Sequence, residues 1–195
     1  MGYFITPMIS IVLGYFFLNE KITKPKFASV CLMFSGILFL FINLNQFPFL
    51  IIWIGTSWAI YGLLRKQVNV NPPIGLLYET FIISLISIPY LVYLFWQNEN
   101  SIFSIDLKTS LFLILTGAVT IFPLFFFNLG LKFIQLGLAG VLFYLAPTFH
   151  FITSVFILNE EILQIKLISF IIIWIGIIIY IYDSYKKEII LNNTQ

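Results

Sequence analysis

The sequence reads FFLNEK at residues 16–21 and FILNEE at residues 156–161, which is nearly the same phrase at a distance of 140 residues. Proline, asparagine, glutamate and glycine all repeat in this one register, and no gap is needed. Chance matches between Leu and Ile residues would not produce that pattern. The repeat is therefore predicted to be a helix, a short loop and a second helix. The matched pairs include Pro7 with Pro147, Glu20 with Glu160 and Gly36 with Gly176.

The composition places this repeat in a lipid bilayer. Of the 195 residues, 61% are hydrophobic and only 9% are charged, and the mean hydropathy is +1.04. No residue from Phe27 to Leu64 or from Phe133 to Asn159 carries a charge, whereas a soluble domain needs a polar surface. The net charge of +2 is too small for nucleic-acid binding, and the single Cys31 excludes an internal disulfide and a thiolate metal site. We expect no metal and no cofactor.

The apolar runs between polar breaks predict an all-α, polytopic membrane protein. A hydrocarbon core of about 30 Å needs roughly 20 helical residues, and these uninterrupted runs exceed the alternating segments of a membrane barrel. Seven transmembrane helices are predicted, at roughly 3–18, 27–44, 48–64, 73–96, 109–131, 136–158 and 164–182.

The basic residues predict the orientation of these helices. Eight of the ten follow the first, third, fifth and seventh predicted helices, which all end on one side of the membrane. Short loops rich in Lys and Arg stay in the cytoplasm, so we expect a cytoplasmic C-terminus and a chain that begins outside. The first residues lack the basic region of a signal peptide.

The two copies of the repeat are predicted to be inverted. The loop from Glu20 to Lys26 has a net charge of +2, the loop from Glu160 to Lys166 has −1, and the predicted orientation puts them on opposite faces. Inverted repeats are typical of secondary transporters. Three further helices precede the second copy, so we expect two five-helix repeats and roughly 90 further residues upstream. The expected division is 1–46 for the last two helices of the first repeat, 47–185 for a complete second repeat and 186–195 for a polar cytoplasmic tail.

Four stretches resemble a known family. The stretches GYFITPMISIVLGYFFLNEKI (2–22) and YLAPTFHFITSVFILNEEI (144–162) resemble repeats of the EamA-type permeases in the drug/metabolite transporter superfamily. YGLLRKQV (61–68) and GLLYET (75–80) narrow the resemblance to the RarD branch, labelled chloramphenicol-sensitive permeases. The resemblance implies ten helices in two inverted repeats around a central cavity, with this chain equal to helices 4 to 10. It also implies a bacterial inner (plasma) membrane protein.

Four residues of the third and fourth predicted helices are candidates for the solute cavity. Glu79 lies inside a predicted span, where a carboxylate is costly and usually binds a substrate cation or relays a proton. The alternative is a Glu near the cytoplasmic interface that pairs with Arg65 or Lys66. Arg65 itself is either a gate or a topology signal at the end of its helix. Trp58 and Tyr61 lie three apart on one helical face and are candidates for lining a cavity for an aromatic solute.

Two more candidates flank a proline in the sixth predicted helix. Pro147 can open the helix and free backbone carbonyls, with Tyr144 on one side and His150 on the other. The alternative for His150 is a hydrogen-bonded core residue, since the chain has no second His for a metal site. Pro123 is a second expected kink.

The remaining repeated residues are expected to be structural. Glu20 and Glu160 close helix ends at the interface, where loop hydrogen bonds or a basic partner would satisfy them. Gly36 and Gly176 are expected to permit close helix packing, and Pro7 marks the start of the repeat.

The function predicted from these patterns is a permease that moves a small organic solute by alternating access, not an enzyme. The expected partners are the lipid bilayer, the solute, a coupling proton, and a second copy or a complementary N-terminal fragment. A non-functional or split-gene remnant of such a transporter is the alternative. An intramembrane hydrolase would need clustered catalytic groups, and the sequence has one His and two adjacent loop acids.

Overall fold

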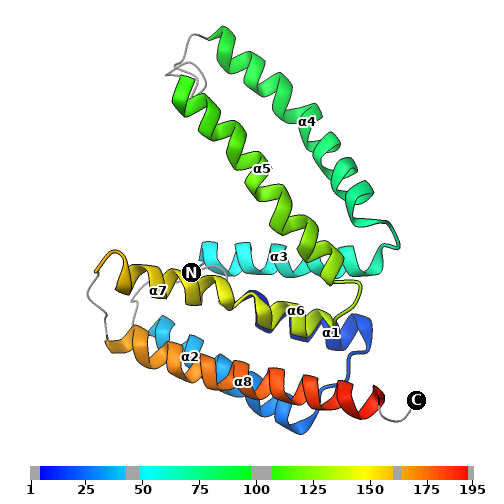
Figure 1. Ribbon diagram of the computed structural model, residues 1–195, viewed down its shortest axis with the longest axis vertical. Helices are drawn as coiled ribbons and strands as arrows, with labels where there is room; N and C mark the ends of the chain where they lie inside the picture. Colours follow the sequence, from blue (N-terminus) through cyan, green and yellow to red (C-terminus); the bar gives the residue numbers. More distant parts are fainter. Residues whose placement is uncertain (1–4, 43–48, 98–106, 160–163, 193–195) are drawn as a thin grey trace. The chain divides into compact units, whose positions relative to one another are not determined.

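The computed structural model describes residues 5–42, 49–97, 107–159 and 164–192 (Figure 1). Every regular element in these ranges is a helix, which agrees with the all-α prediction. Pro7 lies in the first turn of the first helix, and Pro72 and Pro73 begin the fourth, where a missing N–H costs little. The helices are α1 Thr6–Leu18, α2 Lys24–Ile42, α3 Phe49–Gln67, α4 Pro72–Trp96, α5 Leu107–Gly130, α6 Leu136–Leu142, α7 Leu145–Phe156 and α8 Gln164–Asn192.

Five of the predicted spans are long and apolar enough in the described residues to cross a membrane. They are α2, α4, α5, the α6–α7 segment Leu136–Phe156, and α8. The helix α1 has 13 described residues, or about 20 Å at 1.5 Å per residue, and is therefore short of a full span. The apolar spans and the many exposed large hydrophobic side chains make this chain a multi-pass membrane protein.

The helix predicted at 136–158 is divided into α6 and α7 just before Pro147, the residue that was expected to open it. Pro147 has no N–H to donate to the carbonyl of Phe143, four residues earlier. That carbonyl instead accepts from the N–H of Ala146 at 3.1 Å, and the N–H of Tyr144 donates to Val141 at 3.1 Å. Such bonds over three residues tighten the chain and end the α-helix one turn before the proline.

The last helix also differs from the prediction. It continues to Asn192, past the expected end at 182, so residues 183–192 are helical as well. Polar and charged residues are compatible with a helix that leaves the membrane, because their backbone groups remain paired with one another.

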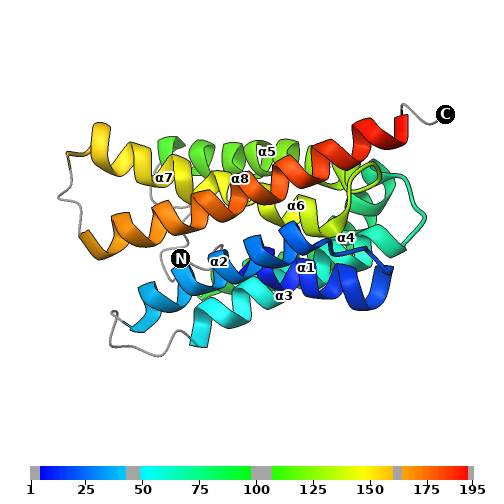
Figure 2. The ribbon, with the colours of Figure 1, turned by 90° about the horizontal axis from the view of Figure 1, so that it is seen from below.

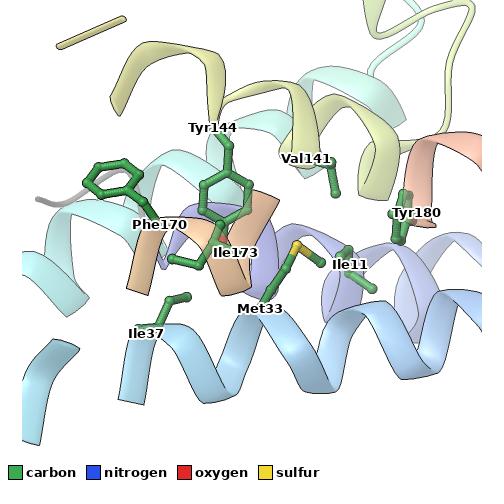
Figure 3. Close-up of a cluster of buried hydrophobic side chains, with 8 residues drawn as sticks. All are labelled: Ile11, Met33, Ile37, Val141, Tyr144, Phe170, Ile173 and Tyr180. Atoms are coloured by element: carbon green, nitrogen blue, oxygen red, sulfur yellow. The ribbon is translucent and has the colours of Figure 1, made fainter. Parts of the chain in front are cut away.

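The chain forms two compact units. Residues 1–67 and 134–195 make unit 1, and residues 68–133 make unit 2, in which α4 packs against α5. In unit 1 the core is a cluster of buried side chains from α1, α2, α8 and the α6–α7 segment. Met33 is fully buried, and Tyr144 extends from the α6–α7 segment toward Ile173 of α8 (Figure 3). The cluster contains Ile11, Met33, Ile37, Val141, Tyr144, Phe170, Ile173 and Tyr180.

The largest contact in unit 1 joins α2 and α8, which lie side by side (Figures 1 and 2). The helices are antiparallel, since Thr23, just before α2, donates a hydrogen bond of 2.6 Å to Asp183 in the C-terminal part of α8. They approach closely at Gly36, where an added Cβ would lie 2.9 Å from Cγ1 of Ile173 and 3.1 Å from the carbonyl oxygen of Ser169.

The same contact occurs a second time with the roles of the helices exchanged. A Cβ added to Gly176 would lie 2.7 Å from Cγ of Met33 and 2.9 Å from the carbonyl oxygen of Ser29. Each residue of one contact is 140 positions from its counterpart in the other, and this reciprocity is what a twofold relation between two helices produces. The counterparts are Gly36 with Gly176, Ser29 with Ser169, and Met33 with Ile173.

The loops of the two hairpins share a backbone feature. Asn19 ends α1 with φ 52° and Asn159 follows α7 with φ 51°; these are the two residues other than glycine with positive φ in the described part of the chain. Asn tolerates this left-handed conformation better than most residues, and it commonly terminates helices there. The repeated LNE phrase thus places its Asn at the same kind of turn in both copies.

Candidate functional site

A network of polar side chains closes one end of unit 1, and Glu20 is its centre. The backbone N–H of Leu136 donates to Oε1 of Glu20 at 2.5 Å, and the N–H of Gly137 donates to Oε2 at 3.0 Å. These amides belong to the first turn of α6, whose N–H groups have no partner inside the helix. The partial positive charge of a helix N-terminus favours a carboxylate at this position.

The carboxylate of Glu20 fits because Gly14 leaves room for it. A Cβ added to Gly14 would lie 2.5 Å from Oε2 of Glu20, and one added to Gly137 would lie 3.4 Å from the same atom. The first distance is shorter than real contacts allow. Glycine at residue 14 is therefore required for the position of Glu20.

Lys26 is the second member of the network and is only 1% exposed. Its Nζ donates to Oε1 of Gln135 at 2.8 Å and lies 4.9 Å from the centre of the Tyr180 ring. A buried ammonium group is costly unless hydrogen bonds and a polarisable neighbour stabilise its charge. Lys26 therefore ties the first turn of α2 both to α8 and to the residue that precedes α6.

Two further bonds close the same end. Oγ1 of Thr23 donates to Oδ2 of Asp183 at 2.6 Å, and Nζ of Lys66 donates to the carbonyl oxygen of Ile134. The loop after α1, the end of α3, the start of α6 and the C-terminal part of α8 therefore meet at one end of unit 1. Several basic residues of the sequence gather at this end, including Lys21, Lys24, Lys26, Arg65 and Lys66.

An apolar cavity of about 580 Å³ lies between α1, α2 and the start of α3 in unit 1. Its volume is within the range of small-molecule sites, but its described lining contains no polar side chain that could orient a solute. The cavity could therefore hold the apolar part of a ligand, but its lining does not indicate which chemical class of ligand binds there. The lining residues are Ile5, Met8, Ile9, Val12, Phe34, Ile37, Leu38, Phe41 and Ile52.

Trp58 and Tyr61 lie together on α3, with their ring centroids 5.4 Å apart. Phe143, which the sequence did not single out, contacts Trp58 edge to face at 5.7 Å. Edge-to-face and tilted pairs at such distances are favourable, so the three rings form a small aromatic cluster in unit 1. Arg65 lies one turn after Tyr61 on α3 and is half-buried.

The two candidates beside Pro147 lie in different environments. Tyr144 is 2% exposed and belongs to the core cluster (Figure 3), so it packs between helices and is not among the described residues that line the apolar cavity. His150 is exposed on α7. The roles of both residues at a solute site stay predictions.

The remaining candidates are in unit 2 or outside the described residues. Glu79 is half-buried on α4, seven residues after its start at Pro72, and Pro123 lies inside α5. Lys132 donates to Oδ1 of Asn71 at 3.4 Å within the same unit. Glu160 lies outside the described residues. Among the residues that the structure describes, no three His, Cys, Asp or Glu side chains gather to hold a metal.

Most of the polar network could not be predicted from sequence patterns. Gln135, Thr23 and Asp183 carry no pattern that predicts their partners. Lys26 does carry a signal, since it aligns with Lys166 in the 140-residue register, as Ser29 aligns with Ser169. The 140-residue register therefore has matches beyond the LNE phrase. The pairs at Lys26 and Ser29 indicate that the helix after the first LNE phrase, α2, also belongs to the repeat.

Comparison with known proteins identifies the family. Residues 47–182 match the EamA-like transporter family. The chain is 30% identical over 186 residues to the uncharacterised transporter YojE of Bacillus subtilis, covering 95% of this chain and 62% of that protein. It is also 30% identical over 186 residues to Protein RarD of Streptomyces exfoliatus, covering 95% and 59%. For Protein RarD of Escherichia coli the identity is 29% over 184 residues, covering 94% and 62%.

The chain thus spans about three fifths of the length of these curated relatives, because the matched shares are 62%, 59% and 62%. The name of the Bacillus subtilis protein describes a transporter. The family match covers residues 47–182, from just before α3 to the membrane part of α8. With its apolar helices and its RarD-like relatives, this chain belongs to the EamA-like transporter family, in the drug/metabolite transporter superfamily.

Proposed function

We propose that this protein is a RarD-like permease that moves a small organic solute across the bacterial inner membrane by alternating access. The observation that carries the proposal is the reciprocal contact of α2 and α8 at Gly36 and Gly176, in a chain that belongs to a transporter family. Two inverted halves related by a twofold axis can exchange their conformations, so that a site between them opens to one face and then to the other.

The basic end of unit 1 supports a cytoplasmic C-terminus. The network around Glu20 joins the loop after α1 to the C-terminal part of α8, and the basic residues at that end would stay on the cytoplasmic side. The partners in this proposal are lipid, the solute and a coupling proton, with Glu79 as a group that could carry that proton or bind a solute cation.

A transport assay with unlabelled solutes tests the proposal. Everted and right-side-out membrane vesicles that contain the protein would be energised and incubated with a cell metabolite extract plus amphenicol antibiotics. Mass spectrometry would then measure what the vesicles accumulate. We expect one class of solute to accumulate in one vesicle orientation, and a protonophore to abolish this. Equal contents in vesicles with and without the protein, in both orientations, would refute the proposal.

A further inference from the structure

We propose that Glu20 is the movable part of a latch that keeps one end of unit 1 closed, and that this end opens when the carboxylate leaves α6. The latch consists of Glu20, Thr23 and Lys26 on one side and residues 135–137 with Asp183 on the other. The inference rests on the proposed transport function, in which one end must open to release or admit the solute.

The first observation is that α6 has no cap of its own. Gln135 occupies the N-cap position in an extended conformation, but its side chain makes no capping hydrogen bond and instead accepts from Lys26. A side chain at the N-cap normally satisfies the free amides of the first turn. Here Glu20, which is more than 100 residues away in the sequence and lies in another hairpin, satisfies the amides of Leu136 and Gly137.

A remote cap has a consequence that a local cap lacks. A local N-cap moves with its helix and stays bonded in every conformation, whereas Glu20 can cap α6 only while the two hairpins are together. When they separate, water must enter to satisfy the amides and the carboxylate, because buried polar groups without partners are costly. In the closed state the carboxylate of Glu20 and the amides of Leu136 and Gly137 therefore bond to one another, and in the open state each bonds to water.

The second observation is that every bond of the latch originates in one short segment. Residues 20–26 contribute Glu20 to α6, Lys26 to Gln135 and Thr23 to Asp183 of α8. The α1–α2 loop thus binds both neighbours at once. Because Lys26 lies in the first turn of α2, a single movement of the loop together with that turn would release all of these bonds and open that end of unit 1.

The third observation is the space reserved for the carboxylate. Gly14 lies so close that a Cβ there would be 2.5 Å from Oε2 of Glu20. The substitution Gly14→Ala would therefore displace the carboxylate without removing its charge. This gives a second variant that disturbs the latch by a different physical route from Glu20→Gln.

Hydrogen exchange of the protein in lipid nanodiscs tests the latch. In Glu20→Gln and in Gly14→Ala we expect the amides of residues 136–137 to exchange at least about tenfold faster than in the wild type, because a hydrogen bond to a charged group is lost. Peptides from the α2–α8 contact should keep their protection. Glu79→Gln is the matched control, since it removes a carboxylate from unit 2 and should leave residues 136–137 unchanged.

Cysteine labelling from the cytoplasmic side separates a latch from a cap that only stabilises α6. Ser10 of α1 is 3% exposed and lies against Gly140, so Ser10→Cys in a Cys31→Ser background should react slowly with a membrane-impermeant maleimide. Adding Glu20→Gln should accelerate this labelling at least about tenfold if that end opens. Fraying confined to the first turn of α6, at residues 136–137, would leave the labelling of Ser10→Cys unchanged.

Either of two results would overturn the proposal. One is unchanged exchange at residues 136–137 or unchanged labelling of Ser10→Cys when Glu20 is replaced. The other is equal loss of protection throughout α2 and α8, which would make Glu20 a structural residue of the whole unit. Neither measurement depends on transport, so a protein that moves no solute would refute the proposed function and still leave the result for the latch readable.

Discussion

The close contact of α2 and α8 predicts that Gly176→Ala destabilises the protein. The new methyl carbon would lie 2.7 Å from Cγ of Met33 and 2.9 Å from the carbonyl oxygen of Ser29, so the helices must move apart. Overpacking of this kind costs about 1–3 kcal/mol, and the gain from replacing glycine within a helix is roughly 0.5–1 kcal/mol. We therefore expect a net loss of about 1–2 kcal/mol in the free energy of unfolding.

The reciprocity of the contact makes a sharper prediction for the double variant. In Gly36→Ala the closest atoms are slightly farther away, at 2.9 Å for Ile173 and 3.1 Å for Ser169, so this change should cost less than Gly176→Ala. Both methyl groups push the same two helices apart. Once the first has separated them, the second should cost less than it does alone, and the two effects should not add.

The measurement is the unfolding of the purified protein in detergent micelles by increasing mole fractions of a denaturing detergent. Gly117→Ala in α5 is the matched control, because nothing lies within 4 Å of a Cβ at that position. It should leave the stability unchanged or raise it slightly. If Gly176→Ala were as stable as Gly117→Ala, the close packing of α2 and α8 would be refuted.

Three other substitutions follow from the positions of the candidate residues. Tyr144→Ala should lower the free energy of unfolding by about 3–5 kcal/mol, since it empties a core position, and a loss below 1 kcal/mol in the same detergent titration would contradict the burial of Tyr144. His150→Ala should change that free energy by less than about 0.5 kcal/mol, because the side chain is exposed, and a larger loss would mean that something covers it. Glu79→Gln should lower the transport rate at least about tenfold while the melting midpoint is retained. A variant that transports at the wild-type rate would contradict a role for Glu79 at the solute site.

Prediction from sequence was most successful where the determinant is local. The apolar runs predicted helices over most of the residues where the structure has them, because in lipid the backbone can satisfy its hydrogen bonds only within a helix or a closed barrel. The opening of the helix near Pro147 was expected because proline has no N–H to donate, but only the structure shows that it falls at Phe143 and Tyr144. The end of α8 was placed too early because hydropathy reports where lipid ends, not where the helix ends.

Prediction was poorest for the candidate site. Trp58 and Tyr61 share a face because helical spacing requires it, but their neighbour Phe143 comes from the turn between α6 and α7, which no sequence period could select. Tyr144 was predicted to line a cavity because it lies beside a proline; the structure places it in the core cluster of unit 1, and its role at a cavity stays a prediction. A spacing rule specifies the face of a helix, and only packing specifies what covers that face.

The sequence by itself determined that this protein lies in a membrane, that it forms helices and that it contains an internal repeat. Hydropathy and backbone hydrogen bonding act over one or two helical turns, and the repeat can be found by aligning the sequence with itself. Tertiary structure alone decided that Glu20 caps α6, that Lys26 binds Gln135, and that Gly36 and Gly176 face reciprocal partners. The physical reason is that these bonds join atoms more than 100 residues apart, and their energy is gained only when the hairpins pack together.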